Sequence, residues 1–314
     1  MADERSFAAR VKAELAHLHT DQQCCQRMEL AGLLRALGRV ELQGGGRMAV
    51  SLSTDSSPVA RKLIRLIRST FGVDYKLMVM RRQKLRKNLV YRVYIPHQDG
   101  LGPMLQACGL LDARGALTEW VDVPELLNDH CRRAYLRGTY QGTGWVSPPE
   151  RQHHLEMITT ATEAADALGQ MLFSYAISVR LAVRKDSLVL YIKDAEQIAR
   201  FLNVVGAHQS LLHYEDVRVL KEMKNRVNRQ VNAEMANVAK VADAAARQAE
   251  ALERLRAAGS LAKLSEPLRE LAQLRLNHPD ASLKELGEMC NPPVGKSGVA
   301  HRMRQLMSLA EGTE

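Results

Sequence analysis

The chain has 314 residues, of which 46% are hydrophobic and 25% are charged, a balance that is typical of a folded globular protein and excludes disorder throughout. Lys and Arg number 44 against 35 Asp and Glu, and the net charge of +9 favours a polyanionic partner such as nucleic acid or an anionic membrane surface. No apolar run approaches the roughly 18 residues of a membrane span, and the start MADERSFAAR lacks a signal-peptide pattern. We therefore expect a cytoplasmic protein. We expect no membrane partner, because the basic residues at 76–92 lie between predicted strands and not on a basic amphipathic helix.

The cysteines are odd in number and include no C-x-x-C pair. They are Cys24, Cys25, Cys108, Cys131 and Cys290. This pattern favours neither a disulfide framework nor a thiolate zinc site. We expect reduced, mostly buried thiols, no metal site and no cofactor.

Along the chain, a helical amino-terminal segment (1–24) precedes a region in which helical and strand periodicity alternate. Helix-like stretches lie near 26–37, 56–71, 98–108, 129–140, 162–173 and 194–204. Segments rich in β-branched and aromatic residues, typical of strands, lie at 73–82, 88–95, 153–160, 177–184 and 187–193. The predicted order is helix, strand, strand, helix, strand, strand, helix, twice over, which places the protein in the α+β class.

A strongly basic run lies between two of the predicted strands. From Lys76 to Arg92 there are seven basic residues and no acidic one. Such a run at a hairpin turn can follow a phosphate backbone and release its counterions, although a solvated basic loop is the alternative. The candidate DNA contacts here are Arg81, Arg82, Lys84, Arg86 and Lys87.

An internal repeat supports the duplicated order. Residues 25–40 laid over 131–146, an offset of 131 − 25 = 106, share six identities in sixteen positions. Glycine or alanine recurs four residues apart in both copies, at Gly32 and Ala36 and at Gly138 and Gly142. A helical strip without bulky side chains lets two backbones approach closely, so we expect the two helices to pack at a pseudo-twofold axis.

Neither Pro nor Gly occurs between Gly206 and Gly259, which predicts a long helical linker over 208–258. Its first part carries four asparagines beside basic residues. Asparagine is a poor helix former, so a contact with DNA or with the preceding domain is one hypothesis and a solvated helix face is the other. The candidates are Asn225, Arg226, Asn228 and Arg229.

The remaining residues, 259–314, predict three helices, at 267–277, 283–290 and 298–310. Ser282 with Glu285 forms a capping box for the second helix, and Ser297 is expected to cap the third. The third helix would place an outward set of polar and basic residues where a helix-turn-helix reads the major groove. These candidates are Lys296, Ser297, His301, Arg302, Arg304 and Gln305. A helix-turn-helix used only for protein contact is the alternative, because acidic and basic residues balance in this segment.

Two motifs carry a resemblance to known families. LAGLLRALG (30–38) is similar to the LAGLIDADG motif of homing endonucleases, and LRGTYQGTG (136–144) is similar to a degraded second copy. The implied fold is two αββαββα halves whose sheets form a saddle over DNA. Where that family has metal-binding acids, this chain has Leu37 and Thr143, which implies a scaffold without catalytic residues. The carboxy-terminal segment, residues 259–314, resembles the helix-turn-helix of sigma-factor region 4.

Taken in order, these parts resemble the WhiA family of bacterial transcription regulators. The expected domains are a helical segment (1–24), LAGLIDADG-like repeats (25–125 and 126–207), a helical linker (208–258) and an all-α helix-turn-helix domain (259–314). The resemblance implies a non-catalytic, nucleoid-associated regulator that binds promoter DNA in sporulation, cell division and chromosome segregation, with an RNA polymerase sigma factor as a further partner. The alternative is a protein-interaction scaffold for a sigma factor or nucleoid-associated protein, with weak DNA specificity.

Overall fold

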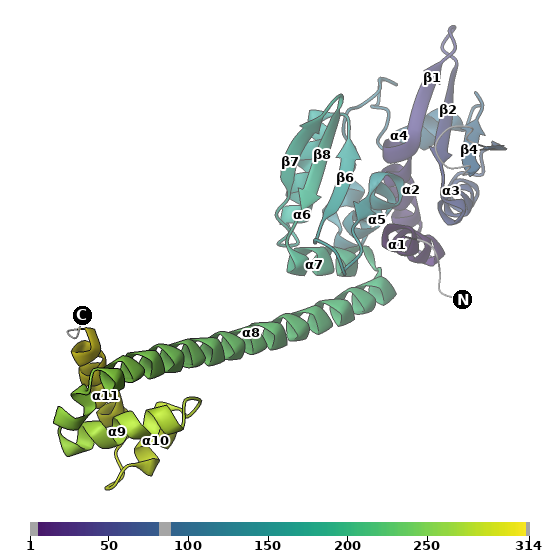
Figure 1. Ribbon diagram of the computed structural model, residues 1–314. Coiled ribbons are helices and arrows are strands. Elements are labelled where there is room, and N and C mark those ends of the chain that lie inside the picture. The colour runs from purple at the N-terminus through teal and green to yellow at the C-terminus, as the bar shows by residue number, and fades with distance from the viewer. Residues whose placement is uncertain (1–5, 82–88, 312–314) are drawn as a thin grey trace. The chain divides into compact units, whose positions relative to one another are not determined.

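The computed structural model describes residues 6–81 and 89–311 (Figure 1). The chain divides into two compact units, with the boundary between Lys221 and Glu222. The first unit is α+β and contains two four-stranded antiparallel sheets, whereas the described part of the second is helical. The predicted fold class is confirmed.

The first half of the first unit is built around one sheet. Its helices are α1 (Phe7–His17), α2 (Gln23–Leu37), α3 (Ser57–Thr70) and α4 (Leu101–Ala107), and its strands are β1 (Gly38–Leu42), β2 (Met48–Thr54), β3 (Lys76–Arg81) and β4 (Leu89–Ile95). The strand order is β1-β2-β4-β3. Strand periodicity in the sequence predicts β3 and β4 but not β1 and β2, because GRVEL and MAVSLST mix small and polar residues and contain no aromatic one.

The second half repeats this arrangement. After the short helix η1 (Pro124–Leu127) come α5 (Asp129–Thr143), β5 (Trp145–Val146), β6 (Leu155–Thr159), α6 (Thr162–Phe173), β7 (Arg180–Arg184), β8 (Ser187–Ile192) and α7 (Ala195–Val205). Its strand order, β5-β6-β8-β7, is equivalent to that of the first sheet. The order of helices and strands expected from the repeat is therefore present in both halves.

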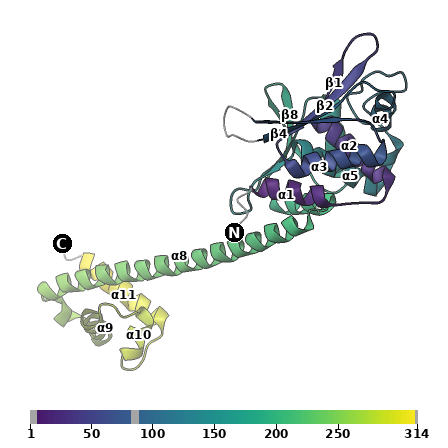
Figure 2. The same cartoon turned by 90° about the vertical axis from the view of Figure 1, so that its right-hand side faces the viewer.

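Helices α2 and α5 pack against each other at the centre of the first unit (Figures 1 and 2). The predicted glycine strip lies at their contact. A Cβ atom added to Gly32 would lie 2.4 Å from the carbonyl oxygen of Tyr135, and one added to Gly138 would lie 2.1 Å from that of Glu29. Both distances are too short for any side chain, so the two backbones touch where the sequence predicted it.

Each sheet turns one face toward the helices. In the first sheet Val50, Leu52, Val93 and Ile95 alternate along β2 and β4 and are buried in the core that α2 and α3 cover. The second sheet is covered by α5 and α6 in the same way. Because strand side chains alternate between faces, the residues between the buried ones lie on the opposite, open face of each sheet.

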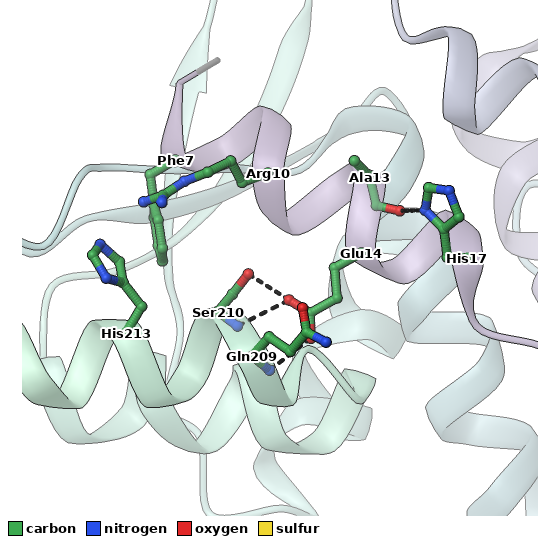
Figure 3. A pocket seen from close by; sticks show the side chains of 8 residues that line it. All are labelled: Phe7, Arg10, Ala13, Glu14, His17, Gln209, Ser210 and His213. Carbon is green, nitrogen blue, oxygen red and sulfur yellow. Dashed lines mark hydrogen bonds between the residues drawn. The ribbon is translucent and has the colours of Figure 1, made fainter. Parts of the chain in front are cut away.

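The long helix α8 (His208–Ala257) begins in the first unit, and a carboxylate from α1 caps its amino end (Figure 3). Glu14 accepts hydrogen bonds from the backbone N–H groups of Gln209 (2.7 Å) and Ser210 (2.9 Å) and from the Ser210 hydroxyl. The first N–H groups of a helix have no partner within the helix. Glu14 therefore fixes where α8 starts and joins it to α1.

The second unit contains the rest of α8, η2 (Ser260–Lys263), α9 (Glu266–Asn277), α10 (Leu283–Met289) and α11 (Lys296–Glu311). The capping box of Ser282 and Glu285 is present at the start of α10. The expectation that Ser297 caps the last helix is wrong, since α11 begins one residue earlier. No described helix is both long and apolar enough to cross a membrane.

Candidate nucleic-acid interface

The open face of the first sheet carries a row of polar and basic residues. Arg39, Ser51, Tyr94 and Lys76 are cross-strand partners on β1, β2, β4 and β3, so they share one face. Arg39 and Lys76 are exposed. This row, named row one below, presents two cations and a phenol from strands that the helices do not cover on this side.

The second sheet carries the equivalent row. Trp145, Glu156, Tyr191 and Arg180 are cross-strand partners on β5, β6, β8 and β7, named row two below. The ring of His154 stacks on Tyr191 at 5.7 Å and lies 6.0 Å from Trp145. Row two therefore combines aromatic surface with a cation, a pairing that suits both phosphates and bases.

The two carboxylates on the open faces, Glu41 and Glu156, lie beside basic side chains. Glu41 lies 3.2 Å from the Arg92 guanidinium, which also donates a hydrogen bond to the Ser51 hydroxyl. Glu156 lies 3.2 Å from His154 and 3.7 Å from Arg184. Pairing reduces the repulsion that these carboxylates would exert on a polyanion lying across the sheets.

The two residues that the motif resemblance aligns with metal-binding acids lie at the ends of the central helices. Leu37 is the last residue of α2 and Thr143 the last residue of α5, directly before the strands that begin the two rows. Leu37 packs against the core, and the Thr143 hydroxyl accepts a hydrogen bond from the N–H of Ile158 at 3.4 Å. A leucine offers no ligand for a divalent cation, and a threonine offers a weak, uncharged one.

The basic run lies only partly within the described residues. Arg81 is the last residue of β3, is exposed, and pairs with Leu89 of β4. Four of the predicted contacts, Arg82, Lys84, Arg86 and Lys87, lie outside the described residues. Lys76, at the other end of β3, belongs to row one.

In the second unit the six candidate major-groove contacts all lie on α11. Val299, Met303, Leu306 and Ala310 of α11 are buried, which orients the opposite side of the helix outward. Five of the six candidates are exposed and Arg302 is half-buried; the exposed ones are Lys296, Ser297, His301, Arg304 and Gln305. Arginine and glutamine side chains can form paired hydrogen bonds with guanine and adenine edges, so this surface can read bases.

A close contact holds α10 against the turn before α11. The N–H of Val294 donates a hydrogen bond to the carbonyl oxygen of Gly287 at 2.8 Å. A Cβ atom at Gly287 would lie 2.1 Å from the carbonyl oxygen of Val294, so only glycine fits. This contact fixes the angle between the two helices of a helix-turn-helix and therefore the direction in which α11 projects.

Arg275, at the end of α9 in the second unit, has a structural role. Arg275 is 1% exposed and donates hydrogen bonds to the carbonyl oxygens of His278, Pro279 and Ala281 in the loop after α9. Burial lowers the pKa of its guanidinium. Arg275 thus holds the loop that leads into α10, and it contributes little to the charge of the surface.

The asparagine-rich stretch lies on α8 within the second unit. Asn225, Arg226, Asn228 and Arg229 are all exposed. Their exposure is compatible with contact to DNA and with a solvated helix face, so both hypotheses stay open. Arg137 of α5, in contrast, is structural: it donates a hydrogen bond to the carbonyl oxygen of Val205 at 2.8 Å and lies 3.5 Å from Glu29.

The two rows were not found from the sequence. Their members come from four strands each and are joined only by strand register, which has no local signal. One sequence signal for row two was the alternation of RLAVR (180–184), which predicts that Arg180 and Arg184 lie on the same face of a strand.

Comparisons with known proteins cover nearly the whole chain. Three family models match: the WhiA N-terminal LAGLIDADG-like domain (residues 23–111), the WhiA LAGLIDADG-like domain (132–224) and the WhiA C-terminal HTH domain (227–310). The chain is 68% identical to "Probable cell division protein WhiA" of Symbiobacterium thermophilum, over 100% of both chains. It is 44% identical to the protein of the same name from Heliobacterium modesticaldum, over 98% of this chain and 96% of that one.

Solved structures show the same fold. The crystal structure of full-length WhiA from Thermatoga maritima matches with a TM-score of 0.58 and 22% identity, covering 98% of each chain. The crystal structure of the N-terminal LAGLIDADG domain of WhiA matches with a TM-score of 0.52 and 19% identity, covering 66% of this chain and 93% of that one.

Proposed function

This chain belongs to the WhiA family, and on that premise we propose that it is a non-catalytic, sequence-specific DNA-binding transcription regulator that acts in cell division. Regulation of promoters in sporulation and chromosome segregation is part of the same proposal, as is a cytoplasmic, nucleoid-associated location. The observation that carries it is the exposed set on α11, which a packed helix-turn-helix holds outward. In this proposal α11 supplies the base readout.

The open sheet faces supply the second contact. Rows one and two each end in a cation on an outer strand, Lys76 and Arg180, and row one begins with the exposed Arg39. Arg81 is five residues from Lys76 along β3, so its side chain lies on the opposite face of the sheet from row one. Contacts from the two rows would bind phosphates without reading sequence. Two modest sites joined by one chain bind more tightly than either alone when both can engage the same DNA.

The non-catalytic part of the proposal is supported by Leu37 and Thr143. Two acids that hold hard cations are what this scaffold needs for phosphodiester cleavage, and neither residue is an acid. The test is incubation of the full chain with supercoiled plasmid in Mg²⁺ or Mn²⁺. We expect no nicked or linear product, and metal-dependent cleavage that survives further purification would overturn this part.

The DNA-binding part is tested with the full chain on DNA selected from a random library or from genome-wide binding. Arg304→Ala with Gln305→Ala should reduce the preference for the selected sequence over random DNA at least about tenfold, since each base contact contributes about 1–3 kcal/mol. Arg269→Ala with Gln273→Ala on α9 is the matched control and should retain the preference. An equal loss in both variants would remove α11 as the reading helix.

A second candidate is a scaffold that binds a protein partner such as a sigma factor. It is favoured by a line of exposed apolar side chains on α8 within the second unit: Met223, Val227, Val231, Met235, Val238 and Val241. Exposed apolar patches of this kind mark protein contacts. If this candidate is right, Val231→Ser with Met235→Ser will abolish sigma-factor binding measured without DNA, while affinity for DNA stays unchanged.

A further inference from the structure

Four side chains with soft or borderline donor atoms meet where the two central helices begin. Cys24 and Cys25 lie in the first turn of α2, and His130 and Cys131 lie in the first turn of α5. One donor atom from each residue, three sulfurs and an imidazole nitrogen, lies within 4.8 Å of all the others. The residues of the two helices are 106 positions apart in sequence, so no local motif shows them.

The internal repeat explains why they meet. The offset of 106 that superposes the two motif helices relates Cys25 to Cys131, and it also relates Cys24 to His130. Equivalent positions on the contacting faces of two helices related by a pseudo-twofold axis lie close to each other near that axis, as these donor atoms do. Each helix therefore contributes a vicinal pair of donors to one point.

Two of the donor distances are close to those of a coordination sphere. The Nδ1 atom of His130 lies 3.2 Å from the Cys25 sulfur and 3.3 Å from the Cys131 sulfur. In a tetrahedral zinc site, bonds of about 2.3 Å to sulfur and 2.0 Å to nitrogen separate the S and N donors by roughly 3.5 Å. These two distances would have to lengthen by only about 0.2–0.3 Å for the three atoms to surround a cation.

The surroundings suit a structural site. Cys25 and Cys131 are buried, Cys24 is half-buried and His130 is exposed, so a cation could enter from the His130 side and would then be shielded on the other. Three thiolates with one imidazole form a Cys₃His set, which is a common structural zinc set.

We propose that Cys24, Cys25, His130 and Cys131 bind one zinc ion that joins the amino ends of α2 and α5. The site lies at the opposite end of the helix pair from Leu37 and Thr143, so it is separate from the cation positions of homing endonucleases. Zinc would connect the two halves of the first unit without taking part in DNA binding or chemistry.

Binding is an exchange of protons for metal and involves no electron transfer. Three S–H bonds break, three Zn–S bonds and one Zn–N bond form, and three protons leave to the buffer. A disulfide between two of the same cysteines is the rival state, and it would need an oxidant. The two states differ in metal content and in the number of free thiols.

The experiment uses the full chain without a histidine tag, purified under reducing conditions and dialysed against a weak chelator. We expect one zinc per chain by inductively coupled plasma mass spectrometry, and tetrahedral Co²⁺ bands with sulfur-to-cobalt charge transfer when Co²⁺ replaces zinc. Cys24→Ser and His130→Ala remove the two less buried ligands and should fold. Each should weaken Zn²⁺ binding more than the about 10–100-fold that loss of an outer-shell partner costs.

Matched controls remove the same residue types elsewhere. Cys290→Ala lies in the second unit and His208→Ala is an exposed histidine at the start of α8, and both should retain one zinc with unchanged affinity. Zinc should also raise the Tm of the unaltered chain but not that of His130→Ala. Any one of three results would overturn the proposal: reduced protein that takes up no zinc, equal zinc loss in controls and cluster variants, or a disulfide within the cluster after anaerobic purification.

Discussion

Glu29 on α2 and Lys62 on α3 form an ion pair of 3.1 Å in which both side chains are buried. The same carboxylate accepts a hydrogen bond from the Gln141 amide at 2.8 Å and lies 3.5 Å from the Arg137 guanidinium of α5. Lys62 also donates a hydrogen bond to the carbonyl oxygen of Leu18. A single carboxylate therefore connects α2, α3 and α5 inside the first unit.

Replacement of Glu29 leaves the buried Lys62 and the half-buried Arg137 without their counter-ion. Glu29→Gln should lower the free energy of unfolding by about 3–5 kcal/mol, the usual cost of breaking a buried pair on one side. Glu29→Leu with Lys62→Met should recover part of this loss, because the more deeply buried of the two cations is removed as well. Chemical unfolding of the unaltered chain, Glu29→Leu, Lys62→Met and the double variant forms a double-mutant cycle that measures the coupling. Strictly additive effects would show that the pair is not coupled.

Loss of the carboxylate that caps α8 should loosen the start of that helix. Glu14→Ala leaves the N–H groups of Gln209 and Ser210 without their acceptor, and we expect a loss of about 0.5–2 kcal/mol in the free energy of unfolding. Hydrogen exchange should increase in the first turn of α8. Asp166→Asn, an exposed carboxylate on α6, is the control and should change neither quantity.

Replacement of glycine by alanine should lower the free energy of unfolding at one helical glycine and raise it at another. Gly138→Ala places a methyl group against the backbone of α2 and should destabilise the first unit by more than about 3 kcal/mol, since packed helices cannot separate locally without losing core contacts. Gly169→Ala on α6 meets only the Val179 side chain at 3.7 Å. It should stabilise the helix by about 0.4–1 kcal/mol. Similar effects at both positions would contradict the close approach of α2 and α5.

Salt dependence should separate phosphate contacts from base contacts. Arg180→Gln in row two removes one phosphate contact and should weaken binding to all sequences, with the slope of log K against log salt reduced by about 1. Gln305→Ala should lower affinity for the selected sequence only and leave the slope unchanged. Fluorescence anisotropy at several salt concentrations measures both, and a uniform loss for Gln305→Ala would contradict its place in base readout.

Two buried tyrosines predict alkaline instability of the first unit. Burial raises the pKa of Tyr135 to about 12 and raises the pKa of Tyr140 further. In the unfolded chain a tyrosine ionises near pH 10, so above about pH 10 the unfolded state binds fewer protons and stability falls as pH rises. This contribution is fully present below pH 10 and is lost as pH rises through about 12.

The check is a series of Tm measurements from pH 9 to about 11.5. Tm should decline across this range, and Tyr140→Phe should decline less steeply because it carries one ionisable phenol fewer. Tyrosinate absorbance should lag behind the unfolded-state titration until the protein unfolds. Parallel pH dependence in the wild-type chain and Tyr140→Phe would show that Tyr140 makes no contribution.

Much of the fold is decided by local sequence. The spacing of apolar residues, the capping box at Ser282 and the absence of Pro and Gly before Gly259 predict helices because each depends on residues within one or two turns. The internal repeat also predicted that α2 and α5 touch at Gly32 and Gly138, because a strip without bulky side chains at equivalent positions of two helices lets their backbones approach closely.

The tertiary structure alone decided what lies beside what. Rows one and two, the carboxylate of Glu29 among three helices, and the cluster that joins Cys24 to Cys131 all bring together residues far apart in the chain. Such neighbours are fixed by strand register and helix packing, which are properties of the whole core and leave no periodic trace in any one segment. Local patterns in the sequence predicted the helices, most of the strands and the twofold plan, but not β1, β2 and β5, and long-range packing determined the sites.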